Sequence, residues 1–298
     1  MLAFLGAGHT EKVGQYKEIV TRSVAWLKSK QDASGLIWDT TDDGARHRAK
    51  GYPGAIATLA MAEAAGMANI KETKEAAQRA INYCIDQHQN GDGSEKLGWR
   101  YGPKEAGDLS VTGWYIMALK SAKVAGLHVS AQSIDGALRF LDSVEHRDAN
   151  ATGPYGAPSQ FWYTTGEEHA ASGHRLTAIG ALARAFTGSP RTALAPTVEW
   201  LVNKGGVPDY GANGEKVDLY YWYYGSMCVF QQGPESMLWK HWNAGMKKAL
   251  SENQCKQGED LGSWNPVGEF SGEWGRAGQT ALSALCMEVY YRYELLEK

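Results

Sequence analysis

The feature that most constrains this chain is a repeat of about 57 residues, each copy of which closes with an aromatic or small residue followed by an apolar one. The five copies are Ala25-Trp26-Leu27, Asn82-Tyr83-Cys84, Arg139-Phe140-Leu141, Glu199-Trp200-Leu201 and Lys248-Ala249-Leu250. Their third positions lie 57, 57, 60 and 49 residues apart. In the first copy, Val20, Val24 and Leu27 share one face at helical spacing, which predicts an amphipathic helix. A period of this length is typical of stacked helix pairs, because one pair alone cannot bury its apolar faces.

A second kind of helix follows each amphipathic one and is apolar or small nearly all round. The predicted ranges are 55–65, 111–125, 176–187, 219–230 and 279–290. A helix without a polar face is buried on both sides. The sequence therefore predicts an all-α fold, an α/α toroid. The helices that are apolar on both faces form its inner ring, and the amphipathic helices, apolar on one face only, form its outer ring.

The predicted domain organisation is a single α/α-toroid domain over residues 1–298, with about five helix pairs. Leu5-Gly6-Ala7-Gly8 has the same context as Gly66, 58 residues later. Residues 1–8 are therefore expected to be the tail of a sixth inner helix. We expect either a fragment of a longer protein or a ring that lacks one helix pair.

Glycine is in excess, with 35 residues in a chain of 298, which is about 12% against the usual ~7%. Gly66, Gly126, Gly188 and Gly233 each follow an inner segment and are expected to end it with a positive φ. Other glycines lie beside an aromatic residue in the loop after each outer helix. These loops are Gly35-Leu-Ile-Trp38, Gly98-Trp99, Pro154-Tyr155-Gly156, Asp209-Tyr210-Gly211 and Gly262-Ser-Trp264.

The charge balance and the cysteines exclude several classes of protein. Thirty Lys and Arg stand against 33 Asp and Glu, for a net charge of −3, which argues against a nucleic-acid partner or a polybasic membrane surface. No apolar run reaches the ~18 residues of a transmembrane segment. The four cysteines are scattered, so neither a disulfide scaffold nor a metal cluster is predicted. Localisation stays open between the cytoplasm and export after removal of a signal.

The repeats resemble those of a known superfamily. Trp26-Leu27 with Gln31, Gly35 and Trp38 resembles the Gln–Trp repeat of squalene–hopene and oxidosqualene cyclases, and Gln254 with Gly262 and Trp264 resembles it too. The whole chain is similar to the α/α toroids that include terpene cyclases, protein prenyltransferase β-subunits and complement-type thioester domains. The resemblance implies their fold.

The motifs that carry the activities of this superfamily are not intact. Asp108-Leu109-Ser110-Val111 occupies the place of the Asp-x-Asp-Asp proton-donor motif of the cyclases but keeps only one Asp. Val217-Asp218-Leu219-Tyr220 resembles the zinc-binding Asp-x-Cys element of prenyltransferases with Tyr220 in place of the Cys, and Arg276 stands near the place of their His ligand. The thioester motif is missing. No metal site and no cofactor are therefore predicted.

The inner helices begin at Gly51-Tyr52, Gly107-Asp108, Gly173-His174-Arg175, Val217-Asp218 and Glu273-Trp274-Gly275-Arg276. In a toroid these turns converge at one mouth of a central cavity. Aromatic side chains with a few polar groups are typical of a ligand pocket. The predicted ligand-binding residues are Tyr52, Trp99, Tyr101, Asp218, Tyr220, Tyr221, Trp274 and Arg276.

Three residues are candidates for catalysis: Asp108, His174 and Arg175. Asp108 and Asp218 are also expected to cap their helices, which lowers the pKa of a carboxyl group and works against proton donation. His174 and Arg175 are two cationic side chains at a helix start, where the helix dipole disfavours positive charge.

Two functions remain open from the sequence. The first is a toroid that binds a hydrophobic or flat small molecule, or a protein, through an aromatic central cavity without the usual catalysis. The alternative is an enzyme in the same cavity. It would be an isoprenoid cyclase that uses Asp108, or a polysaccharide lyase that uses His174, Arg175 and tyrosines as base and cation.

Overall fold

The computed structural model describes residues 1–39, 51–91, 97–147, 156–166 and 173–292. These residues form two compact units. Unit 1 contains Met1–Glu145, Phe161–Ala171 and Phe186–Gly188; unit 2 contains His146–Gln160, Ser172–Ala185 and Ser189–Lys298. Each unit is described by itself.

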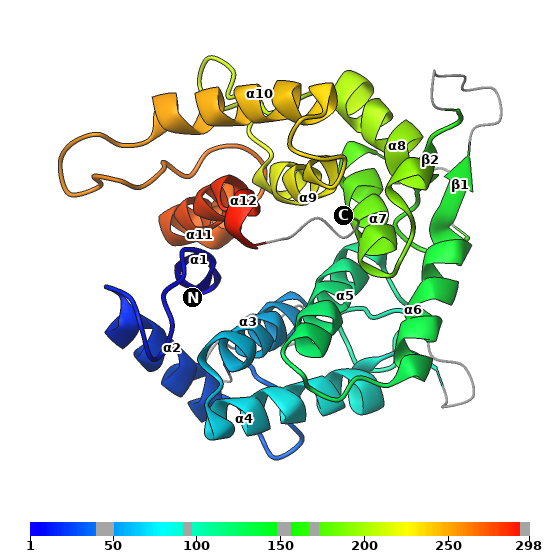
Figure 1. Ribbon diagram of the computed structural model, residues 1–298, viewed down its shortest axis with the longest axis vertical. Helices are drawn as coiled ribbons and strands as arrows, with labels where there is room; N and C mark the ends of the chain where they lie inside the picture. Colours follow the sequence, from blue (N-terminus) through cyan, green and yellow to red (C-terminus); the bar gives the residue numbers. More distant parts are fainter. Residues whose placement is uncertain (40–50, 92–96, 148–155, 167–172, 293–298) are drawn as a thin grey trace. The chain divides into compact units, whose positions relative to one another are not determined.

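Unit 1 contains helices of two kinds that alternate along the chain (Figure 1). Two are buried nearly all round: α3 (Tyr52–Ala68) and α5 (Leu109–Val124). Three are amphipathic: α2 (Lys17–Ser29), α4 (Lys71–Asn82), which continues as a π-helical turn (Tyr83–His88), and α6 (Ala131–Val144). The helix α3 packs against α2, α4 and α5. A short helix, α1 (Leu2–Gly6), also contacts α3.

Unit 2 repeats the same alternation. Its helices are α7 (His174–Phe186), α8 (Arg191–Trp200) with a π-helical turn (Leu201–Gly205), α9 (Leu219–Phe230), α10 (Met237–Asn253), α11 (Ser271–Met287) and α12 (Val289–Arg292). The helix α9 is buried along almost its whole length and packs against α10, α11 and α12. Two short strands, β1 (Glu145–Arg147) and β2 (Ser159–Phe161), form a two-stranded sheet.

The fold class predicted from the sequence is confirmed, because the chain is mainly helical and one-faced helices alternate with buried ones as in an α/α toroid. The helix α9 has the predicted bounds, and α1 ends shortly before Gly8, whose φ is +84°. The single domain and the missing helix pair stay predictions. In the third predicted Gly–aromatic loop, Pro154 and Tyr155 lie outside the described residues.

The expectation for Gly66 is wrong. The helix α3 continues to Ala68, and Asn69, with a φ of 51°, is the left-handed residue that ends it. A Cβ on Gly66 would lie 3.0 Å from the Cβ of Ala125, so this glycine allows α3 to pack closely against the chain that follows α5. The φ values of Gly126, Gly188 and Gly233 are positive, as predicted.

Glutamine and tryptophan side chains link the outer helix of the second repeat to the chain around it. The Gln89 amide donates to the carbonyls of Leu97 (2.7 Å) and Ser133 (3.0 Å) and accepts from the Ser133 hydroxyl (2.6 Å). Gln89 is 0% exposed. Trp99 Nε1 donates to the Cys84 carbonyl at 2.9 Å. Trp99 therefore fixes its Gly–aromatic loop to the outer helix, and Gln89 ties this loop to α6.

Replacing Gln89 with Met tests this link. The substitution keeps the length of the side chain but leaves two carbonyls and one hydroxyl without their partner in a buried place. Since each unsatisfied buried polar group costs about 1–3 kcal/mol, we expect Gln89→Met to lower the free energy of unfolding in urea by about 3 kcal/mol. Gln15→Met, at an exposed position, is the control and should change it little; equal effects of the two would contradict the role of Gln89.

Candidate functional site

Three tyrosine side chains meet near the start of α5 in unit 1, and we call Tyr52, Tyr101 and Tyr163 the tyrosine cluster. The hydroxyls of Tyr101 and Tyr163 are 2.8 Å apart, and the ring centres of Tyr52 and Tyr101 are 5.8 Å apart. All three residues are half-buried. Tyr52 is the first residue of α3, Tyr101 lies in the loop before α5, and Tyr163 follows β2. The cluster therefore joins three segments that are distant in the sequence.

Backbone contacts hold these segments together. The N–H of Leu109 donates to the Tyr163 carbonyl at 2.8 Å, and the N–H of Asp108 donates to the Trp99 carbonyl at 2.9 Å. A Cβ on Gly51 would lie 3.0 Å from the Cα of Tyr101, so glycine is needed there for the loop to lie against the start of α3. The tyrosine cluster is thus placed by the backbone around the first residues of α5.

Asp108 is the N-cap of α5 and lies beneath the cluster. Its Oδ1 accepts from the N–H of Val111 and from the Ser110 hydroxyl, both at 2.8 Å. The Ser110 hydroxyl in turn lies 2.6 Å from the Tyr52 hydroxyl. Asp108 is 0% exposed. Its carboxyl group is therefore fully buried beneath hydroxyl neighbours that come from different segments of the chain.

The pKa of Asp108 is raised above its usual 3.8 because burial penalises the charged form. The Val111 N–H, the Ser110 hydroxyl, Arg100 and Tyr163 lower the pKa, but burial has the larger effect. The expectation that capping would lower this pKa is wrong, because desolvation outweighs the hydrogen bonds. A higher pKa makes the carboxylate a stronger base and keeps the acid available to higher pH.

Arg100 supplies the positive charge at this site. Its guanidinium carbon lies 6.0 Å from the ring centre of Tyr101 and 5.9 Å from that of Tyr163. The Arg100 carbonyl is 2.8 Å from His88 Nε2, and His88 Nδ1 is 2.8 Å from the Tyr115 hydroxyl. Burial lowers the pKa of His88, which favours the neutral ring. In that form His88 Nε2 donates to the Arg100 carbonyl and His88 Nδ1 accepts from the Tyr115 hydroxyl. His88 therefore holds the loop that carries Arg100 and Tyr101 in place.

A second group of predicted residues meets in unit 2, and we call His174, Arg175, Asp218 and Glu269 the Arg175 ion-pair cluster. The Arg175 guanidinium binds Asp218 through Nε and Glu269 through Nη2. His174 Nε2 lies 3.4 Å from Asp218 Oδ2. The guanidinium also lies 5.3 Å from the ring centre of Phe270. Arg175 therefore has two carboxylate partners within its own unit.

Asp218 caps α9 as Asp108 caps α5, since its Oδ1 accepts from the N–H of Tyr221 at 3.0 Å. Burial by itself would raise the pKa of Asp218, but His174, the Tyr221 N–H and Arg175 together lower it below 3.8. The expectation that capping accompanies a lowered pKa is confirmed at Asp218. Two aspartates in the same local position thus have pKa values shifted in opposite directions.

The remaining predicted residues are placed by packing and hydrogen bonds, and among them the Tyr221 ring lies 4.5 Å from that of His174 in the ion-pair cluster. Trp99 is 0% exposed and stacks on Tyr115 at 5.3 Å, within the core. Tyr221 is also buried, and its hydroxyl donates to the carbonyls of Leu201 (2.9 Å) and Gly206 (3.0 Å). Tyr220 is half-buried beside Tyr224, with ring centres 5.2 Å apart.

Trp274 and Arg276 belong to the first turns of α11. The Trp274 ring lies 5.9 Å from that of Phe270. Arg276 binds the loop before its helix, at 3.0 Å from the Ser263 hydroxyl, 2.8 Å from the Asn265 amide oxygen and 3.1 Å from the Asp260 carboxylate. These contacts give Arg276 a structural role in its own unit.

Sequence reasoning missed Arg100, Ser110 and Tyr163 at the tyrosine cluster and Glu269 at the ion-pair cluster. Arg100 and Ser110 directly neighbour the predicted residues Tyr101 and Asp108. The run Phe161-Trp162-Tyr163 is an aromatic signal, but nothing in the sequence connects it to α5. Nothing near Glu269 in the sequence indicates that it binds Arg175.

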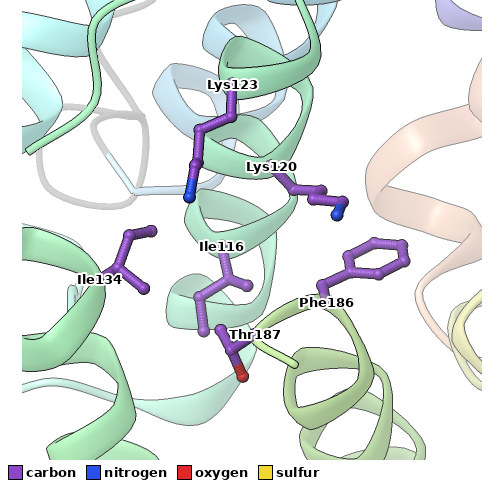
Figure 2. Close-up of a pocket in the computed structure, with 6 residues that line it drawn as sticks. All are labelled: Ile116, Lys120, Lys123, Ile134, Phe186 and Thr187. Carbon is purple, nitrogen blue, oxygen red and sulfur yellow. The ribbon is translucent and has the colours of Figure 1, made fainter. Parts of the chain in front are cut away.

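A separate pocket of about 110 Å³ lies along the C-terminal half of α5. Figure 2 shows the Ile116 side chain between those of Ile134 and Phe186, with Lys120 and Lys123 on the same helix as Ile116. No residue predicted from the sequence lines this pocket. Within the described residues, no group of three His, Cys, Asp or Glu side chains is placed to hold a metal ion. None of the helices described is long and apolar enough to cross a membrane.

Comparison with known proteins finds a likeness at the level of the fold. No family model and no curated protein sequence matches this chain. Among solved structures, the chain is similar to a novel alpha-amylase from Clostridium perfringens, with a TM-score of 0.60 and 14% sequence identity. The match covers 97% of this chain and 83% of the amylase. The two chains share a fold. At this identity the likeness concerns the fold alone, and no comparison singles out the terpene cyclases.

Asp108→Asn tests the raised pKa. Asn caps a helix about as well as Asp, but it cannot ionise. Because the folded state binds the Asp108 proton more tightly than the unfolded chain, this group lowers stability as pH rises from 3.8 through the folded pKa. We therefore expect the difference in Tm, variant minus wild type, to become more positive between about pH 3 and about pH 7. Calorimetric melting curves measure it.

Asp218→Asn is the matched control at the other cap. The lowered pKa of Asp218 means that its contribution to stability is present above 3.8 and is lost as pH falls through the folded value. At neutral pH this variant leaves Arg175 without one of its partners, and we expect a loss of about 3 kcal/mol. The same pH trend for both variants would contradict the opposite shifts.

Proposed function

We propose that this protein binds carbohydrate chains at the tyrosine cluster of unit 1. The observation that carries the proposal is the combination of three half-buried tyrosines with Arg100 above a buried carboxyl group. Sugar rings present C–H faces that pack on aromatic rings and hydroxyls that hydrogen-bond at ring edges. Tyrosine offers both an apolar face and a polar tip.

The polar groups of the cluster favour a sugar over the hydrophobic ligand predicted from the sequence. Besides the tyrosine hydroxyls, the site contains the guanidinium of Arg100. A hydrocarbon ligand would remove water from these half-buried groups and give no hydrogen bond in return, which costs about 1–3 kcal/mol for each group. A ligand rich in hydroxyls replaces the lost water contacts.

The structural likeness supports the same class of ligand. The similar protein is described as an alpha-amylase, and amylases act on starch-type α-glucans. Because a shared fold does not imply a shared function, the likeness guides only the choice of ligand to test first.

Titration calorimetry with maltooligosaccharides tests the proposal. We expect binding by the wild-type protein and a loss of at least about 10-fold in affinity for Tyr101→Ala, since an aromatic contact contributes about 0.5–1.5 kcal/mol beyond the area it buries. The matched control is Tyr210→Ala, which removes a half-buried tyrosine from a Gly–aromatic loop of unit 2. An equal loss in both variants, or no glucan binding by the wild type, would contradict the proposal.

A second candidate function is hydrolysis of the bound glycan with Asp108 in the proton-transfer step. Burial and the raised pKa of Asp108 favour it, because active sites tune carboxyl groups in this direction. Glycoside hydrolases ordinarily use two carboxyl groups, and Asp108 supplies one of them. The lyase alternative is favoured less, because Arg175 already binds Asp218 and Glu269 and so has fewer donors to offer a uronate.

Release of reducing ends from a soluble glucan measures this activity. If Asp108 takes part, we expect Asp108→Asn to reduce the rate by at least about 100-fold while glucan binding stays measurable. Asp86→Asn, at an exposed position of unit 1, is the control. Full activity of Asp108→Asn, or no turnover by the wild type, would reject hydrolysis and leave carbohydrate binding as the function.

A further inference from the structure

The side chain of Asp108 is enclosed on all sides, yet it is linked to a residue that is not. The link has two steps: Asp108 Oδ1 to the Ser110 hydroxyl at 2.8 Å, and the Ser110 hydroxyl to the Tyr52 hydroxyl at 2.6 Å. Asp108 is 0% exposed and Ser110 is 5% exposed, whereas Tyr52 is half-buried. A ligand that reaches this site meets Tyr52 before it meets the carboxyl group.

The direction of the two hydrogen bonds follows from proton counting. An ionised carboxylate only accepts, so Ser110 must donate its single hydroxyl proton to Asp108. The Ser110 oxygen has no second proton to give, so in its contact with Tyr52 it accepts and Tyr52 donates. Both protons point inward, from Tyr52 towards Asp108, which is the arrangement required for passing a proton to the carboxylate.

We propose that Asp108, Ser110 and Tyr52 form a proton relay in which the Tyr52 hydroxyl is the group that reacts with substrate. When Tyr52 Oη forms a bond to a substrate atom or takes a proton from it, its own proton moves to Ser110 Oγ. The Ser110 proton moves to Asp108 Oδ1 in the same step. Tyr52 need not become a free phenolate, and the carboxylate ends as a carboxylic acid.

Two further observations support the relay. The pKa of Tyr52 is raised, chiefly by burial and also by the negative charge of Asp108, so an isolated phenolate is disfavoured and a coupled transfer is the easier route. Asp108 is 0% exposed. A buried carboxylate is a better proton acceptor than a solvated one, because burial penalises its charged form.

Tyr101 provides an internal comparison. Its hydroxyl is 2.8 Å from that of Tyr163, so its hydrogen bond leads to a second phenol instead of the Ser110 hydroxyl. Both residues are half-buried and their rings are neighbours. The relay therefore predicts that Tyr52 is a better nucleophile than Tyr101 for a reason other than exposure.

Labelling with methanesulfonyl fluoride tests the relay without any carbohydrate. Tyr52 Oη attacks sulfur, an S–O bond forms, the S–F bond breaks, fluoride leaves, and the phenolic proton passes through Ser110 to Asp108. Peptide mass spectrometry reads the site and rate of labelling. We expect Tyr52 to react at least about 10-fold faster than Tyr101 near neutral pH, in line with the usual size of general-base assistance.

The variants decide the outcome. Ser110→Ala should slow the labelling of Tyr52 by at least about 10-fold and leave that of Tyr101 unchanged. Asp108→Asn should slow the labelling of Tyr52 to the same degree, while Ser110→Thr, which keeps the hydroxyl, should retain it. The rate in the wild type should rise with pH through the ionisation of Asp108. Absence of label on Tyr52, or a rate that Ser110→Ala does not change, would overturn the relay.

The proton relay lies at the same site as the proposed carbohydrate binding, and its use in hydrolysis rests on that proposed function. The two proposals can nevertheless be rejected independently of each other. Sulfonylation of Tyr52 needs no glycan, and glucan binding to Ser110→Ala is measured by calorimetry on the same preparation. Fast labelling without glucan binding would keep the relay and reject the carbohydrate. Glucan binding with slow labelling of Tyr52 would reject the relay and keep the carbohydrate ligand.

Discussion

The buried amide of Gln89 is the contact on which the first unit and its candidate site depend. It joins the end of one outer helix to the loop at Leu97 and to the next outer helix at Ser133. Trp99 then fixes the same loop to Cys84, and the Trp99 carbonyl receives the N–H of Asp108. The hydrogen bonds of Gln89 and Trp99, which join one repeat to the next, therefore also position Arg100, Tyr101 and Asp108. Stability and site geometry come from one set of hydrogen bonds.

Asp108 and Asp218 show how a repeated fold makes different chemistry from one local pattern. Each caps a buried helix and accepts the N–H three residues later. Asp218 accepts hydrogen bonds from His174, the Tyr221 N–H and the charged Arg175, and together these contacts outweigh its burial. Asp108 meets mainly hydroxyl groups, so burial decides its pKa. The neighbours supplied by other segments, and not the cap, set the acidity.

Sequence periodicity predicted the fold better than it predicted the site. Helix faces and caps depend on neighbours three or four residues away, so α9 and the capping role of Asp108 could be predicted. Gly66 could not, because its packing against Ala125 comes from a helix pair 59 residues further on. The same limit applies to Tyr163, which reaches Tyr101 across 62 residues, and to Glu269, which reaches Arg175 across 94. Such contacts depend on loop paths that no local pattern encodes.

The choice of Asp over Asn at position 108 is the strongest physical argument for a chemical role there. Either residue can cap α5 equally well. A buried carboxyl group with a raised pKa makes folding less favourable at neutral pH, whereas Asn would remove the ionisation. A residue that is unfavourable for stability and unnecessary for capping is expected where its charge is used, because strain and desolvation concentrate at functional sites. Its hydrogen-bonded path to Tyr52 gives that charge a route to the half-buried tyrosine cluster.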